Sequence, residues 1–174
     1  MISRRTFIVA GTAGGAALAI AWWLRGGPGR PRTSVEPTLA GLDPEAPTIV
    51  AAIVPAMLAG ALPTGEEARQ TSIRETVAGV EHAIAGLNPY AQQELAQLFS
   101  LLAFAPARVA LTGVSAPWAE ASEDAVTAFL ERWRTSSFAL LRSAYDALHQ
   151  LICAAWYGNP KTWPAIGYPG PPDI

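Results

Sequence analysis

Residues 138–158 read FALLRSAYDALHQLICAAWYG, and this stretch decides the fold class. Its apolar side chains recur at intervals of three and four residues, which places them on one face of an α-helix. That face comprises Phe138, Leu141, Tyr145, Leu148, Ile152 and Trp156. Gly158 follows at a position where glycine commonly ends a helix. The stretch therefore predicts a long amphipathic helix over about 137–157 that buries one face in a core.

Four stretches before it show the same helical spacing. They cover about 44–62, 66–87, 89–111 and 122–136. The first contains Pro47 and Pro55, which predict a kink or a late start, and the third is expected to continue past Pro106. No stretch alternates with period two for long enough to predict a strand. The sequence therefore predicts an all-α fold, a compact bundle of four to five helices.

The chain divides into four segments by composition. Residues 1–24 hold an uncharged apolar run after a basic start, and residues 25–42 form a Gly/Pro-rich linker. The helical domain covers 43–158 and begins at an Asp43-Pro44 cap. The last segment, 159–174, contains five prolines and is predicted to be an extended tail that wraps over a surface. Trp163 and Tyr168 lie in it and need something to pack on, either the bundle itself or a partner.

The start of the chain has the order of an export leader. Ser3, Arg4, Arg5, Thr6 and Phe7 resemble the twin-arginine consensus, and an uncharged run follows to residue 24. This predicts export to the periplasm, with a plain membrane anchor as the alternative. An Ala-x-Ala site at 19–21 permits cleavage. The run is also about 27 Å long as a helix, enough to stay in the membrane as an anchor.

Charge and motifs narrow the function. The net charge is −2, and beyond Arg4 and Arg5 the chain has 10 basic against 14 acidic residues. No basic stripe runs along a helix, so nucleic-acid binding is not predicted. One cysteine and two histidines are present, without hydrolase, metalloprotease or phosphate-loop motifs. We therefore expect no catalytic or metal-binding residues and no cofactor bound by this chain itself.

Cys153 lies on a second, polar stripe of the 137–157 helix. Arg142, Asp146 and His149 precede it at steps of four, three and four. An accessible lone thiol in an oxidising compartment indicates an intermolecular disulfide, whereas a buried one would be a small apolar side chain. Both readings stay open. His149, one turn earlier, could also activate the thiol or share a metal.

Three acidic residues near the fourth helix offer a different alternative. Glu120, Glu123 and Asp124 could be read as an acidic catalytic pair. Because negative charge is favoured at a helix start, we expect them to stabilise the beginning of that helix instead.

The C-terminal region carries a resemblance to a known family. Ala155-Trp156-Tyr157-Gly158-Asn159-Pro160, then Trp163, then Ile166-Gly167-Tyr168-Pro169-Gly170-Pro171-Pro172 resemble the C-terminal signature of the gluconate 2-dehydrogenase subunit 3 family. That family includes the small (gamma) subunits of membrane-bound, FAD-dependent dehydrogenases of the glucose–methanol–choline class. The leader and the helical middle also agree, the middle in pattern only.

The resemblance implies a non-catalytic role. In that family the small subunit carries the twin-arginine leader and escorts a leaderless flavin subunit across the membrane, and a cytochrome c subunit often completes the complex. FAD is then expected in the partner subunit. The last helix and the tail are expected to bind this partner through Cys153, Trp156, Trp163, Tyr168, Pro169 and Gly170. The alternative is a stand-alone periplasmic or membrane-tethered helical binding protein.

Overall fold

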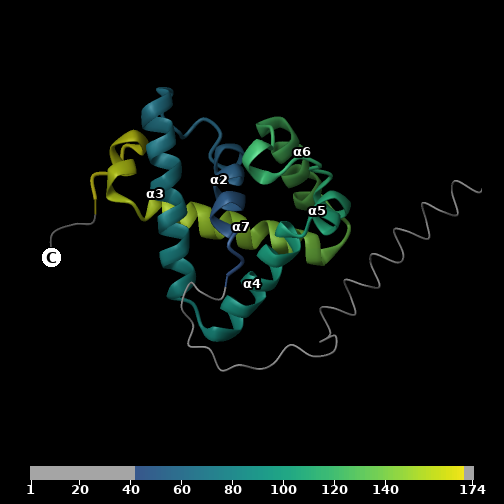
Figure 1. Ribbon diagram of the computed structural model, residues 1–174. Helices are drawn as coiled ribbons and strands as arrows, with labels where there is room; N and C mark the ends of the chain where they lie inside the picture. Colours follow the sequence, from purple (N-terminus) through teal and green to yellow (C-terminus); the bar gives the residue numbers. More distant parts are fainter. Residues whose placement is uncertain (1–41, 171–174) are drawn as a thin grey trace, which may run out of the picture.

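The computed structural model describes residues 42–170 (Figure 1). This part of the chain contains six α-helices and two 3-10 helices and no strand, which confirms the all-α prediction. The elements are α2 (Ala46–Met57), α3 (Glu66–Ala85), α4 (Pro89–Ala103), α5 (Ala105–Thr112), η2 (Trp118–Glu120), α6 (Glu123–Arg134), α7 (Ala139–Tyr157) and η3 (Pro160–Ile166). The leader residues Ser3, Arg4, Arg5 and Phe7 lie outside the described residues, as does the linker up to residue 41.

Local sequence explains where the helices begin. The Asn88 side chain accepts a hydrogen bond from the Ala91 amide at 3.0 Å, which caps α4 before Pro89. Ser122 caps α6 in the same way through the Ala125 amide at 3.3 Å. α2 keeps Pro55 inside the helix and ends at Met57, about one turn earlier than predicted.

The predicted third helix is two helices. Phe104 adopts an extended conformation, with φ −71° and ψ 108°, and separates α4 from α5. Pro106 then lies in the first turn of α5, where a proline is tolerated. The axes of α4 and α5 differ by 93°, so residues 42–170 form six α-helices rather than the predicted four or five. Between residues 42 and 170 no single helix is long and apolar enough to span a membrane, although α4 and α5 reach this composition together.

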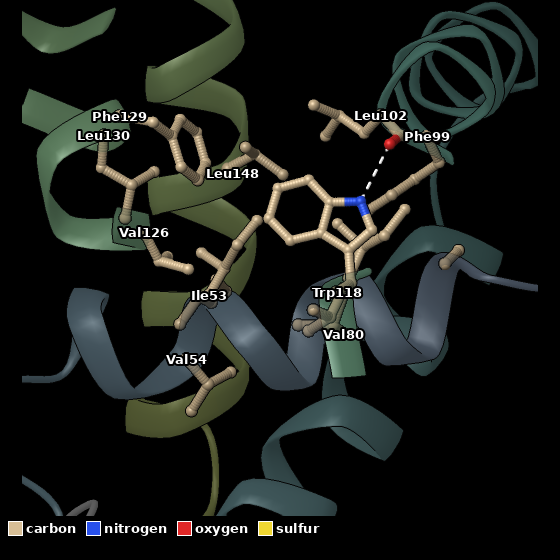
Figure 2. Close-up of a cluster of buried hydrophobic side chains, with 14 of the residues drawn as sticks. Ile53, Val54, Val80, Phe99, Leu102, Trp118, Val126, Phe129, Leu130 and Leu148 are labelled. Carbon is tan, nitrogen blue, oxygen red and sulfur yellow. Dashed lines mark hydrogen bonds between the residues drawn. The ribbon is translucent and has the colours of Figure 1, made fainter. Parts of the chain in front are cut away.

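The core is arranged around α2, and α7 runs across the bundle (Figure 1). Ile49, Ile53 and Val54 of α2 are fully buried. Figure 2 shows Trp118 of η2 inside this core, donating its indole N–H to the Leu102 carbonyl oxygen at 2.8 Å. The Trp118 ring meets Phe129 edge to face at 5.8 Å. The large rings therefore fix α4, η2 and α6 relative to one another.

Candidate partner-binding surface

The C-terminal end of α7 is positioned by close packing on α3. A Cβ atom added at Gly79 would lie 3.0 Å from the Ala155 Cβ, so the two helices approach closely through small residues. Gly158 ends α7 as predicted, in a right-handed conformation with φ −74°. A Cβ there would lie 2.6 Å from the Ala154 carbonyl oxygen. Position 158 therefore requires glycine for space rather than for a left-handed backbone.

The tail begins as a helical turn rather than as the predicted extended segment. The Asn159 side chain caps η3 by accepting a hydrogen bond from the Lys161 amide at 3.1 Å. The Thr162 hydroxyl lies 2.8 Å from the Trp156 carbonyl oxygen and can donate to it. Prolines at the first and fifth positions are accommodated because a 3-10 turn of seven residues uses few amide donors. The tail therefore folds back onto the end of α7, and residues 171–174 lie outside the described residues.

A polar contact ties η3 to α3. Glu75 of α3 accepts hydrogen bonds from the Lys161 ammonium at 2.6 Å and from the Asn159 amide at 3.1 Å. The hydrogen bond from Lys161, followed by that from Asn159, lowers the pKa of the Glu75 carboxyl. The tail is thus held by α3 as well as by α7.

Exposed and half-buried residues at this end of the chain form a cluster, which we call the tail patch: Tyr157, Trp163, Tyr168, Pro169 and Gly170. The Trp163 indole N–H donates to the Tyr157 carbonyl oxygen at 2.7 Å. The Trp163 ring meets Tyr168 edge to face at 5.1 Å, and Gly170 lies close enough to the indole that a Cβ there would be 3.3 Å away. Trp163 is half-buried, while Tyr168 is 45% exposed and Pro169 is exposed. The predicted site residues 163 and 168–170 are therefore brought together at the surface.

Trp156 requires a correction. The sequence placed it both on the core face and among the partner-binding residues, but its side chain is only 4% exposed and belongs to the core cluster. A side chain at this depth cannot form part of a contact surface. Its indole N–H is buried without a hydrogen-bond partner within the described residues, a state that costs about 1–3 kcal/mol. Trp156 helps to hold the tail in place, because its carbonyl oxygen accepts a hydrogen bond from the Thr162 hydroxyl of η3.

Cys153 lies between the two alternatives considered for it. The polar stripe is at the surface, since Arg142, Asp146 and His149 are exposed, but Cys153 itself is half-buried. Its Sγ is 3.6 Å from the His149 Nε2. Burial raises the pKa of the Cys153 thiol above its ordinary value, which disfavours the reactive thiolate.

The other candidate groups have structural roles in the described residues. Glu123 pairs with Arg69 of α3 at 2.7 Å and, with Asp124, lies in the first turn of α6, which agrees with the stabilising role predicted there. No set of three metal-ligating side chains occurs between residues 42 and 170. A cavity of about 120 Å³ lies between the start of α2 and α3, bordered by Val50, Val77 and Phe99. It is smaller than usual small-molecule sites.

Sequence reasoning missed the residues that hold the tail. Asn159-Pro160 repeats the cap-and-proline pattern of Asn88-Pro89, so the start of η3 could have been predicted from the same signal. The contact of Glu75 with Lys161 spans 86 positions along the chain and has no local signal.

Comparisons with protein-family models, with curated proteins and with solved structures give no match for this chain.

Proposed function

We propose that this chain is a non-catalytic small subunit that escorts a leaderless FAD-dependent dehydrogenase subunit through twin-arginine export to the periplasm and supports its maturation. The flavin belongs to the partner subunit, and a cytochrome c subunit is a further candidate member of the complex. The leader string from Ser3 to Phe7 and the C-terminal family signature support the proposal.

The observation that carries the proposal is the tail patch. Two aromatic rings are held in place by intramolecular bonds and yet remain partly open to solvent. Aromatic residues that are already ordered lose little conformational entropy on binding, which is typical of interface anchors. The patch is therefore suited to binding a protein partner.

Export provides the first test. Arg4→Lys together with Arg5→Lys should retain both this chain and the flavin subunit in the cytoplasm, measured by fractionation and immunoblotting of the two co-expressed proteins. A matched change away from the leader, Arg74→Lys, should leave both in the periplasm. Undiminished partner export in the double variant would contradict the escort role.

Binding provides the second test. Trp163→Ala should weaken association with the flavin subunit by about 2 kcal/mol, a loss of roughly thirtyfold in Kd, measured by calorimetry on the purified subunits. Tyr90→Ala, which removes an exposed aromatic ring at the start of α4, should change Kd little. Equal effects of the two changes would contradict the assignment of the tail patch.

Cys153 gives a separate prediction. If the half-buried thiol bonds the partner, a non-reducing gel of the purified complex should show a reducible band that contains both chains and that Cys153→Ser removes. Absence of the band would contradict the predicted disulfide but would not affect the assignment of the tail patch as the interface.

A further inference from the structure

Helix α5 has its polar and apolar faces reversed. Of its eight residues, APARVALT, only Arg108 and Thr112 are polar, and these two are the buried ones. Arg108 is 6% exposed, whereas Ala105, Pro106, Val109 and Ala110 are exposed. Phe104, directly before the helix, is 62% exposed. A surface helix normally presents the opposite arrangement to water.

The inward polar side chains are required by the turn after α5. The Thr112 hydroxyl donates to the Arg108 carbonyl oxygen at 2.7 Å and accepts from the Val114 amide at 3.1 Å. The Arg108 guanidinium donates to the carbonyl oxygens of Val114 and Ser115 at 3.3 and 3.4 Å. Closing this turn therefore uses every polar side chain of α5 and leaves only apolar residues on its outer face.

The end of α6 and the start of α7 extend the same region. The Trp133 indole N–H donates to the Leu111 carbonyl oxygen at 3.0 Å, and Arg132 donates to the carbonyl of Thr112. Figure 1 shows α5 on the same side of the molecule as the connection from α6 to α7. At that connection Phe138 is 71% and Leu140 59% exposed. We call this set of exposed apolar residues, from the α5 region and from the start of α7, the α5 face: Phe104, Ala105, Pro106, Val109, Ala110, Phe138 and Leu140.

Charge around the α5 face differs from the rest of the domain. Residues 42–170 carry twelve acidic and seven basic side chains, a net charge of −5. Three of the seven basic residues nevertheless lie exposed in the last turn of α6 and the first turn of α7: Arg132, Arg134 and Arg142. The acidic residue among them, Glu131, is paired with Arg134 at 2.7 Å. Glu123 and Asp124 lie at the other end of α6, about 15 Å away.

We propose that the α5 face is a lipid-binding surface that inserts its apolar side chains at the headgroup–acyl boundary of an anionic membrane. Exposed Phe, Leu and Val beside arginines have the composition of interfacial membrane-binding elements. Each arginine near an anionic surface adds attraction, while a wholly acidic domain would be repelled. A protein partner is the competing occupant, and the test below separates the two.

The position of the face agrees with this role. α7 has 19 residues and is about 28 Å long, with Phe138 and Leu140 at its first turn and the tail patch at its last. Phe138 and Leu140 of the α5 face therefore lie at the opposite end of α7 from the tail patch. The tail patch stays open to a protein while the α5 face rests on lipid, so the inference extends the proposed function without depending on it.

Depth-dependent fluorescence quenching tests the proposal on the full chain. In a Cys153→Ser background, Val109→Cys and Leu140→Cys are labelled singly with an environment-sensitive fluorophore. Tyr90→Cys is the control, because position 90 is also exposed but lies at the far end of α4, about 20 Å along that helix from Phe104. The chains are bound to phosphatidylcholine vesicles that contain phosphatidylglycerol and a spin-labelled lipid.

Labels at 109 and 140 should be blue-shifted and quenched by the spin-labelled lipid, and the label at 90 should not. Arg132→Gln with Arg142→Gln should reduce the quenched fraction about fivefold or more, and phosphatidylcholine alone should do the same. Equal quenching at 90, 109 and 140 would overturn the proposal, because the leader alone would then hold the chain. A blue shift at 109 only after addition of the flavin subunit would overturn it in favour of protein docking.

Discussion

The C-terminal ends of α7 and α5 face the same structural problem and solve it with different residues. Near η3, the last carbonyls of α7 are satisfied by residues that follow the helix, such as Thr162, and Glu75 of α3 holds the tail. At α5, the helix closes its own end with Arg108 and Thr112. The first solution leaves aromatic rings at the surface within a polar frame, whereas the second leaves a purely apolar surface. The source of the capping groups thus decides what each end presents to its surroundings.

Of the changes that test this comparison, removal of the buried Arg108 guanidinium should have the largest effect on the free energy of unfolding. Arg108→Ala leaves two carbonyl oxygens of the turn without their donor and opens a cavity, so we expect a loss of about 2–4 kcal/mol in the free energy of unfolding. Urea denaturation measures it. Arg74→Ala is the control, since Arg74 is exposed and bonds only the Thr71 side chain, and should cost under about 0.5 kcal/mol. A small effect of Arg108→Ala would show that the turn closes without it.

A methyl group added at the end of α7 should have an intermediate effect on the free energy of unfolding. Gly158→Ala places a Cβ against the Ala154 carbonyl and should cost about 1–2 kcal/mol in thermal or chemical unfolding. Gly86 offers the matched position, because it also ends a long helix in a right-handed conformation but would place its Cβ at an ordinary 3.5 Å. Gly86→Ala should be neutral or stabilise by about 0.5 kcal/mol. Identical results for the two glycines would rule out the steric explanation.

The ion pair of the tail should give the smallest effect. Because Lys161 is largely exposed, Glu75→Gln should change the free energy of unfolding by no more than about 0.5 kcal/mol, but it should speed amide exchange in η3. The pKa of Glu75 is lowered in the folded chain, so its contribution is present above about pH 4.5 and is lost as the pH falls through the folded value. Exchange in the parent should therefore approach that of the variant in acid. If the exchange rates of the η3 amides in the parent, corrected for intrinsic rates, do not change as the pH falls, this result would contradict the contact.

Periodicity predicted the all-α class and the core faces of the helices, but not every helix boundary and not the surfaces. The stripe from Ile73 to Ile84 predicts α3 because one apolar face must be buried, and the structure agrees. The break at Phe104 escaped prediction because Pro106 is compatible both with a kinked helix and with the first turn of a new one. The inward position of the polar residues of α5 was not predicted, because it depends on a tertiary contact. The turn after α5 folds back so that the Val114 carbonyl oxygen accepts a hydrogen bond from Arg108. Trp156 belongs to the core face by its helical spacing and to the C-terminal motif by its position, and its burial shows that the core face determines its role.

The position of α2 has a mechanical consequence. The chain enters the described domain at its first turn, and α2 contacts α3, α4, α6, α7 and η2 while burying Ile49 and Ile53 completely. A pull on the N-terminal side is therefore applied to the element with the most extensive support, not to a helix at the periphery. The domain should resist such a load and then yield in one cooperative step. A pull from the C-terminal side would meet η3 first and should peel the structure in stages.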